Sequence, residues 1–160
     1  MAGFVVRSIG RDITTEVRTT LRAPGCGHPV HREVARGTGP CRECLCAFDV
    51  GREERLLFTY NPFWADVEQL AQPGPVFIHA AECDLDSTQA YPKGLTSLPV
   101  VAQAHHDDGT TSAPRALMAG SEADSLRTWL DEPSVRFLHL RHADAGCYVA
   151  RVDRVAIDQV

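Results

Sequence analysis

Long apolar runs, basic runs and lysine are scarce in this 160-residue sequence. No apolar run approaches roughly 18 residues, so we expect no membrane-spanning helix. Lys93 is the only lysine, the net charge is −5, and no arginine stripe with interleaved aromatics occurs, so we expect no nucleic-acid partner. The first residues lack a cationic segment followed by an apolar stretch, so we expect no signal peptide and a cytoplasmic location.

Several motifs that identify common enzyme classes are also absent. The glycines at 25–27 and 37–39 lack the strand-to-helix context and the spacing of a phosphate-binding loop. Neither the GxSxG of α/β-hydrolases nor the HExxH of zinc proteases occurs. The sequence therefore leaves open whether the protein is an enzyme, and no pattern in it indicates an oligomeric state.

The residues that are present predict an α+β fold. A hydrophobic fraction of 44% and a charged fraction of 23% are typical of a globular protein, and the length suits a single domain over 1–160. We expect an antiparallel sheet, two helices (11–22 and 121–130), and an irregular segment rich in Cys and His at 24–53. Strands are expected at 3–8, 55–63, 75–80, 100–106, 111–120, 134–142 and 146–155, and loops at 64–74 and 86–99.

Two closely spaced pairs of potential metal ligands stand out, Cys41-x-x-Cys44 and His79-x-x-x-Cys83. A CxxC at a tight turn can direct both thiolates at one ion, and a second pair at a strand end can complete a tetrahedron. Structural zinc sites with three cysteines and one histidine are built in this way. We therefore expect a zinc ion that crosslinks the irregular segment to the strand at 75–80.

Two other interpretations of these cysteines stay open. Free cysteine is a small side chain suited to a core, so the four residues can simply be buried. A thioredoxin-like redox pair would need its CxxC at the start of a helix, whereas the residues after Cys44 read as a strand and a turn. No role is assigned to the remaining nearby candidates, which are Cys26, His28, His31 and Cys46.

The C-terminal hairpin carries a second candidate site. Strand alternation places Leu138 and Leu140 on one face with Tyr148, Ala150 and Val152. The opposite face then gathers His139, Arg141, Cys147 and Arg151. Two guanidinium groups would suit a small anionic molecule, and they would favour the thiolate of Cys147 as a nucleophile with His139 as its base. The alternative is an ordinary solvated sheet face.

Three segments resemble a known family. "GPCRECLCAFDVGREERLLFTYNPF", "GPVFIH" and "DEPSVRFLHLRHADAGCYVARVDR" are similar to DUF1203, a family of small bacterial proteins of unknown function. The resemblance covers most of the chain and is strongest over 39–60 and 131–154. The family pattern matches here at Pro40–Arg42, Leu56–Tyr60 and Gly146–Tyr148. The resemblance implies no activity.

The resemblance also implies which features belong to this chain's own branch. Many members have no counterpart of Cys44 and carry Arg at the position of His79, so a metal site would belong to a branch of the family. The resemblance further implies an alternative site, in which Cys41, Arg42 and Tyr60 line a pocket with residues of the C-terminal hairpin. In that enzyme hypothesis a thiol or a metal-bound water attacks the substrate, with Cys41 or Cys147 as nucleophile and His79 or His139 as base. Arg42, Tyr60, Arg141 and Arg151 would bind the anionic substrate.

Overall fold

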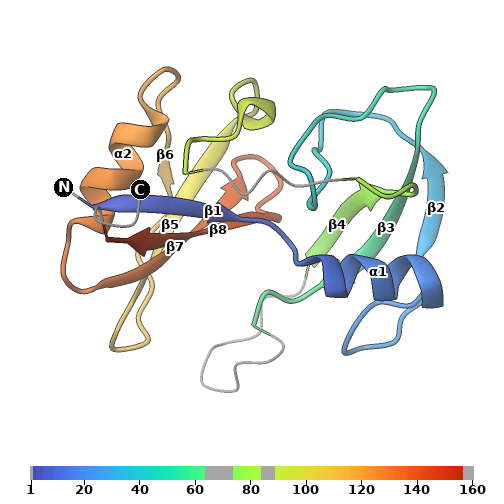
Figure 1. Cartoon of the computed structure of the whole chain (residues 1–160), viewed down its shortest axis with the longest axis horizontal. Coiled ribbons are helices and arrows are strands. Elements are labelled where there is room, and N and C mark those ends of the chain that lie inside the picture. The colour runs from blue at the N-terminus through green and yellow to red at the C-terminus, as the bar shows by residue number, and fades with distance from the viewer. Residues whose placement is uncertain (1, 64–73, 84–88, 157–160) are drawn as a thin grey trace. The chain divides into compact units, whose positions relative to one another are not determined.

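The computed structural model describes residues 2–63, 74–83 and 89–156 (Figure 1). The chain divides into two compact units, which are described separately below. Unit 1 comprises residues 1–7 and 87–160, and unit 2 comprises residues 8–86. The described residues hold two α-helices and two antiparallel sheets, which confirms the α+β class. The single domain over 1–160 stays a prediction. None of the described helices is long and apolar enough to span a membrane.

Unit 1 is built on a five-stranded antiparallel sheet with the strand order β1-β8-β7-β5-β6 (Figure 1). Its strands are β1 (Gly3–Arg7), β5 (Val100–His106), β6 (Arg115–Ala116), β7 (Val135–His142) and β8 (Tyr148–Val155). Helix α2 (Glu122–Leu130) packs on β7 and β1 and buries Leu126, Trp129 and Leu130. The predicted strand at 111–120 shortens to the two residues of β6, because Pro114 has no N–H to donate to a ladder.

The core face of unit 1 follows the alternation that the sequence predicts, up to one irregularity. Leu138 pairs with Val152 and Leu140 pairs with Ala150, and all four side chains are buried. The register then shifts between Leu140 and Arg141. An extra residue at such a bulge inverts the facing of the residues beyond it.

The bulge overturns the prediction made for Tyr148. Arg141 pairs with Tyr148, and the Tyr148 ring meets the His139 ring edge-on at 5.1 Å between centroids. Tyr148 therefore lies on the face of His139 instead of the leucine face. That face is also not solvated, since Phe137 is 2% exposed and His139 is 1% exposed.

Unit 2 contains a three-stranded antiparallel sheet with the order β2-β3-β4 and one helix (Figure 1). The elements are α1 (Arg11–Thr20), β2 (His31–Val34), β3 (Glu54–Tyr60) and β4 (Gly74–His79). In the register of β3 with β4, Leu56 pairs with Ile78 and Phe58 pairs with Val76, and these four side chains form a buried face. β3 ends at Tyr60 because Asn61-Pro62 follows.

Three local predictions differ from the structure. β2 lies inside the segment expected to be irregular; its sequence HREV gives no alternation because its residues are exposed or half-buried at a sheet edge. Helix α1 ends at Thr20, since Leu21 adopts a left-handed conformation with φ of 51° and is exposed. A short 3-10 helix (Lys93–Leu95) interrupts the loop expected at 86–99. The loop expected at 64–74 lies, except for its last residue, outside the described residues.

Candidate metal centre

Cys41, Cys44, His79 and Cys83 converge in unit 2, as their spacing predicts. Their ligand atoms all lie within 4.8 Å of one another. Cys41 Sγ lies 3.7 Å from Cys83 Sγ, and Cys44 Sγ lies 3.6 Å from His79 Nδ1. Cys41 is buried and the other three are half-buried, and none of the three cysteines forms a disulfide. Each close pair joins the CxxC turn to β4 or its continuation, because His79 is the last residue of β4 and Cys83 follows it.

Backbone hydrogen bonds hold the CxxC turn against the end of β4. Within the turn, Leu45 N donates to Cys41 O at 2.8 Å, and Leu45 takes a left-handed conformation with φ of 59°. Arg42 N donates to Phe77 O at 2.8 Å, and His79 N donates to Cys41 Sγ at 3.4 Å. The turn thus continues the edge of the sheet beyond β4, which places its two sulfurs beside His79.

The spacing of the donors fits a tetrahedral zinc ion. With Zn–S bonds of about 2.3 Å and Zn–N bonds of about 2.0–2.1 Å, a tetrahedron has S–S edges near 3.8 Å and S–N edges near 3.6 Å. The distances from Cys41 to Cys83 and from Cys44 to His79 are 3.7 Å and 3.6 Å. The other edges, at no more than 4.8 Å, would shorten by at most about 1.2 Å around an ion.

The three thiols share their protons unequally. Hydrogen bonds from Cys44 and then Cys83 hold the pKa of Cys41 far below the usual range. The hydrogen bond to Cys41 raises the pKa of Cys44 to about 12, and the hydrogen bonds to Cys41 and Cys44 raise the pKa of Cys83 further. Among the three sulfurs, Cys41 is therefore the one on which negative charge is most favoured, whereas Cys44 and Cys83 favour the protonated form. A metal ion that takes thiolate ligands from all three must displace the protons that they hold.

Charged side chains that the sequence patterns do not single out surround the four residues. Glu43, inside the CxxC, is 3% exposed and accepts a hydrogen bond from Cys83 Sγ at 3.4 Å. Arg18 of α1 pairs with Glu43 at 2.6 Å. Glu53, just before β3, lies 3.5 Å from His79 Nε2. Glu43 lies between the two cysteines in the sequence, but only the folded chain brings Arg18 and Glu53 to them.

The other nearby Cys and His residues do not join this cluster. Cys26, His28, His31 and Cys46 are all exposed. Cys46 Sγ contacts Cys44 O at 3.5 Å. Among the described residues, the group of mutually close ligands contains four members and none of these.

The two predicted binding residues of unit 2 are buried. Arg42 is 2% exposed, and its Nη1 donates to Pro40 O at 2.6 Å. Tyr60 is 9% exposed and lies edge-on to Phe58 at 6.5 Å, and burial raises the pKa of its phenol to about 12. The predicted pocket needs residues of both units, so a joint site of Arg42 and Tyr60 with the hairpin stays a prediction.

The two predicted binding arginines of unit 1 have partners within that unit. Arg141 Nε donates to Gln103 Oε1 at 3.3 Å, and its Nη1 donates to Gly146 O at 3.1 Å. Arg151 Nε donates to Asp153 Oδ1 at 2.8 Å, and its guanidinium lies 3.9 Å from the centre of the Phe137 ring. A small anionic ligand for these arginines stays a prediction.

Of the predicted catalytic pair of unit 1, His139 lies in β7, whereas Cys147 lies in the connection just before β8. Cys147 is half-buried, with Sγ 3.8 Å from Ala145 O. His139 packs against the ring of His105, with 4.5 Å between centroids. Burial lowers the pKa of His139 to about 2 and that of His105 to about 4, so both imidazoles are neutral at pH 7. The roles of Cys147 as nucleophile and His139 as base stay predictions.

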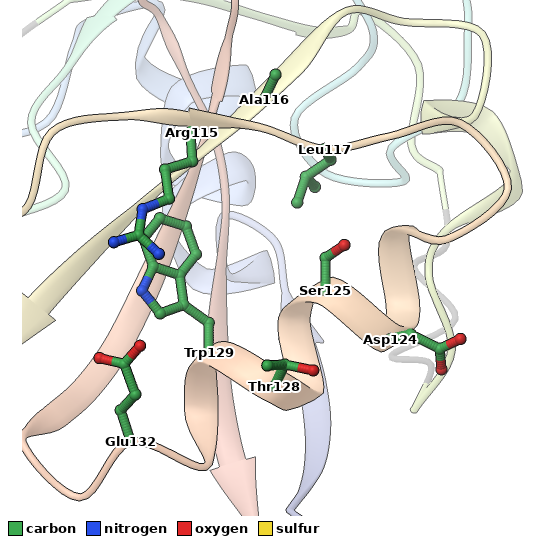
Figure 2. A pocket seen from close by; sticks show the side chains of 8 residues that line it. All are labelled: Arg115, Ala116, Leu117, Asp124, Ser125, Thr128, Trp129 and Glu132. Atoms are coloured by element: carbon green, nitrogen blue, oxygen red, sulfur yellow. The ribbon is translucent and has the colours of Figure 1, made fainter.

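Unit 1 also has a hollow of about 390 Å³ between β6 and α2. Figure 2 shows the Arg115 side chain reaching from the strand and lying alongside the indole of Trp129. The guanidinium lies 4.4 Å from the ring centre. The residues that line this hollow include none of the predicted site residues.

The fold and the cluster together define an α+β protein with a Cys₃His group that could hold a metal ion. Comparison with protein families matches residues 38–154 to the family described as "Protein of unknown function (DUF1203)". The chain belongs to the DUF1203 family, as its sequence resemblance predicts, and the match includes all four clustered residues. Comparison with curated proteins and with solved structures gives no match.

Proposed function

We propose that unit 2 is a zinc-binding module in which Cys41, Cys44, His79 and Cys83 hold one ion in a structural site. The observation that carries this proposal is the pair of distances, 3.7 Å and 3.6 Å, which match the S–S and S–N edges of a zinc tetrahedron. One distance joins the CxxC turn to His79 at the end of β4, and the other joins it to Cys83 in the segment after β4.

The donor set favours zinc over harder cations. Thiolate and imidazole are the ligands of tetrahedral zinc, whereas magnesium and calcium take oxygen ligands. Four protein ligands leave no open position for water or substrate, which is the arrangement of a structural zinc site. The proposal therefore favours a structural role for the ion over a metal-bound water.

The ion would contribute to the stability of unit 2. Its helix α1 has 10 residues and its sheet has three short strands, while much of 35–53 has no regular structure. Small units of this kind gain folding free energy when a metal joins distant segments, because the site is not formed in the unfolded chain. The cytoplasmic location, which would keep the thiols reduced, belongs to the same proposal.

Metal analysis of the purified protein tests the proposal. We expect about one equivalent of zinc after purification without chelator, by plasma mass spectrometry. Cobalt substitution should give the visible absorption of a tetrahedral ion and a thiolate charge-transfer band in the near ultraviolet. Zinc content well below one equivalent, with no cobalt spectrum after reconstitution, would overturn it.

A matched pair of cysteine variants locates the site. Cys44→Ser removes a proposed ligand, and Cys46→Ser removes an exposed thiol two residues away. We expect the Cys44 variant to lose the bound zinc and the Cys46 variant to keep it. Equal zinc content in the two variants would contradict the ligand assignment.

A further inference from the structure

We propose that Arg18 is the positioning residue of this centre: it supplies no ligand but holds the two ligand pairs together, and it thereby couples zinc binding to the docking of helix α1. This inference rests on the proposed zinc site. It adds a residue and a structural consequence to that site which the four ligands alone do not imply.

Arg18 contacts both halves of the centre from a third element. Toward the CxxC half, its Nη2 donates to Glu43 Oε2 at 2.6 Å. Toward the other half, its Nε and Nη2 each lie 3.1 Å from His79 O, and Nη2 lies 3.8 Å from Cys83 Sγ. The Arg18 side chain is 12% exposed, so these contacts are shielded from water. One guanidinium therefore bridges the segments that carry the ligands.

The planar fork of arginine explains why this residue type suits the position. A guanidinium presents five N–H donors in a fixed geometry, so it can hold a carboxylate, a carbonyl and a sulfur at the same time. Fixing ligand-bearing segments before the ion arrives reduces the ordering that binding must supply. Outer-shell contacts of this kind typically change metal affinity about 10–100-fold when removed.

Glu43 makes the charge of Arg18 necessary. Its carboxylate is 3% exposed and lies 3.4 Å from Cys83 Sγ, and Thr14 Oγ1 also donates to it at 3.0 Å. Three thiolates around a divalent ion carry a net charge of −1, and the carboxylate adds another negative charge beside them. Without Arg18, this buried carboxylate would oppose the thiolates that zinc requires.

Coupling between the ion and α1 follows by linkage. Thr14 and Arg18 both belong to α1, and both contact Glu43 inside the CxxC turn. If the contacts of α1 favour the metal-bound arrangement, then the metal must favour the docked helix by the same free energy. We therefore expect zinc to slow hydrogen exchange of the α1 amides.

Zinc competition with a chromogenic chelator tests the role of Arg18. We expect Arg18→Gln to weaken zinc binding about 10–100-fold, while cobalt still gives a tetrahedral spectrum because all four ligands remain. Arg22→Gln is the matched control, since Arg22 is exposed just beyond the end of α1. The double variant Arg18→Gln with Glu43→Gln should regain part of the lost affinity, because it removes the unpaired carboxylate but does not restore the contacts of Arg18 with His79 O. Zinc affinity of Arg18→Gln within twofold of wild type, or no recovery in the double variant, would overturn the inference.

Two further measurements separate this role from simple stabilisation of the fold. A purely structural Arg18 would lower the melting temperature equally with and without zinc, whereas a positioning residue lowers the zinc-induced increase. Hydrogen exchange of wild-type α1 with and without zinc needs no variant to fold, and an unchanged α1 would overturn the coupling. If wild-type protein binds zinc but these tests fail, the role of Arg18 is rejected and the proposed zinc site stands. Wild-type protein that binds no zinc rejects the proposed function and this inference with it.

Discussion

The two ring nitrogens of His79 face different groups: Nε2 lies 3.5 Å from Glu53 Oε2, and Nδ1 lies 3.6 Å from Cys44 Sγ. The ring is also packed against Phe48, with 4.5 Å between ring centroids. A neutral imidazole carries one proton, and a carboxylate acceptor favours that proton on the nitrogen facing it. Glu53 therefore leaves the lone pair of Nδ1 directed toward the sulfurs, as metal-binding histidines require.

The first prediction concerns Glu53. We expect Glu53→Ala to weaken zinc binding about 10–100-fold, because the His79 ring loses the acceptor that fixes its tautomer. Glu53→Gln keeps an acceptor oxygen and should lose less. Glu54→Ala is the control, since the adjacent Glu54 is exposed and pairs with Arg32 at 2.8 Å. If chelator competition gives the same zinc affinity for Glu53→Ala and Glu54→Ala, Glu53 has no part in the centre.

The second prediction concerns removal of the metal. All four proposed ligands belong to unit 2, so a chelator should loosen the strands of that unit selectively. We expect faster hydrogen exchange in β3 and β4 after chelation, and little change in β7 and β8 of unit 1. The measurement is exchange mass spectrometry with peptides that cover each strand. Equal loosening of both units, or none in unit 2, would contradict a structural ion in unit 2.

The ligand set could be predicted from sequence because each pair is local. Cys41-x-x-Cys44 and His79-x-x-x-Cys83 show their spacing directly, and soft ligands in such pairs favour one ion. The residues around them could not be predicted. A glutamate in a turn is expected to be exposed, but Glu43 is only 3% exposed. The turn continues the edge of the sheet beyond β4, and Arg18 of α1 covers Glu43 there.

The fold shows the same division between local and non-local information. Alternation correctly predicts that Leu138 and Leu140 face the core, since strand periodicity is a local property. The alternation fails at Tyr148, because the bulge after Leu140 arises from the pairing of β7 with β8. The sequence of neither strand alone indicates the bulge. His105 is likewise buried beside His139, although its sequence context is that of a strand end before a turn.

The third prediction concerns pH. Burial, together with the charges of Arg141 and Arg151, lowers the pKa of His105 to about 4. Burial, together with the nearby His105 and the same two arginines, lowers the pKa of His139 to about 2. Both pKa values lie below the unfolded value of about 6.5, so the unfolded chain binds more protons in acid. The stabilisation is present above about pH 6.5 and is lost as the pH falls toward the folded values, by about 1.4 kcal/mol per pH unit for each histidine.

Denaturant unfolding at several pH values between about 7 and 4.5 tests this prediction. We expect the free energy of unfolding of His105→Gln to fall less steeply with acid than that of wild type, because one titrating group is gone. Acid also weakens zinc binding, so the comparison between variants isolates the histidine. The exposed His28→Gln is the control. Parallel pH profiles for wild type and His105→Gln would show that His105 does not contribute.

The fourth prediction concerns Arg115, which belongs to the two-residue strand β6. Its guanidinium lies over the Trp129 ring, 4.4 Å from the ring centre (Figure 2). Trp129 is 6% exposed, so the arginine side chain helps to cover it. We expect Arg115→Ala to lower the free energy of unfolding by about 0.5–1 kcal/mol, through lost cation–π contact and lost packing of the stem. Arg136→Ala is the control, because Arg136 lies 5.9 Å from the Phe137 ring and should contribute less.

Tryptophan fluorescence identifies the cause of this loss. The chain has two tryptophans, so a Trp64→Phe background leaves Trp129 as the single fluorophore. Removing the guanidinium should then shift the emission to longer wavelength and increase quenching by acrylamide, because water reaches the indole face. A stability loss without either change would mean that Arg115 acts on the sheet edge and does not cover Trp129. Unchanged stability and unchanged emission together would mean that the hollow between β6 and α2 tolerates the loss of this side chain.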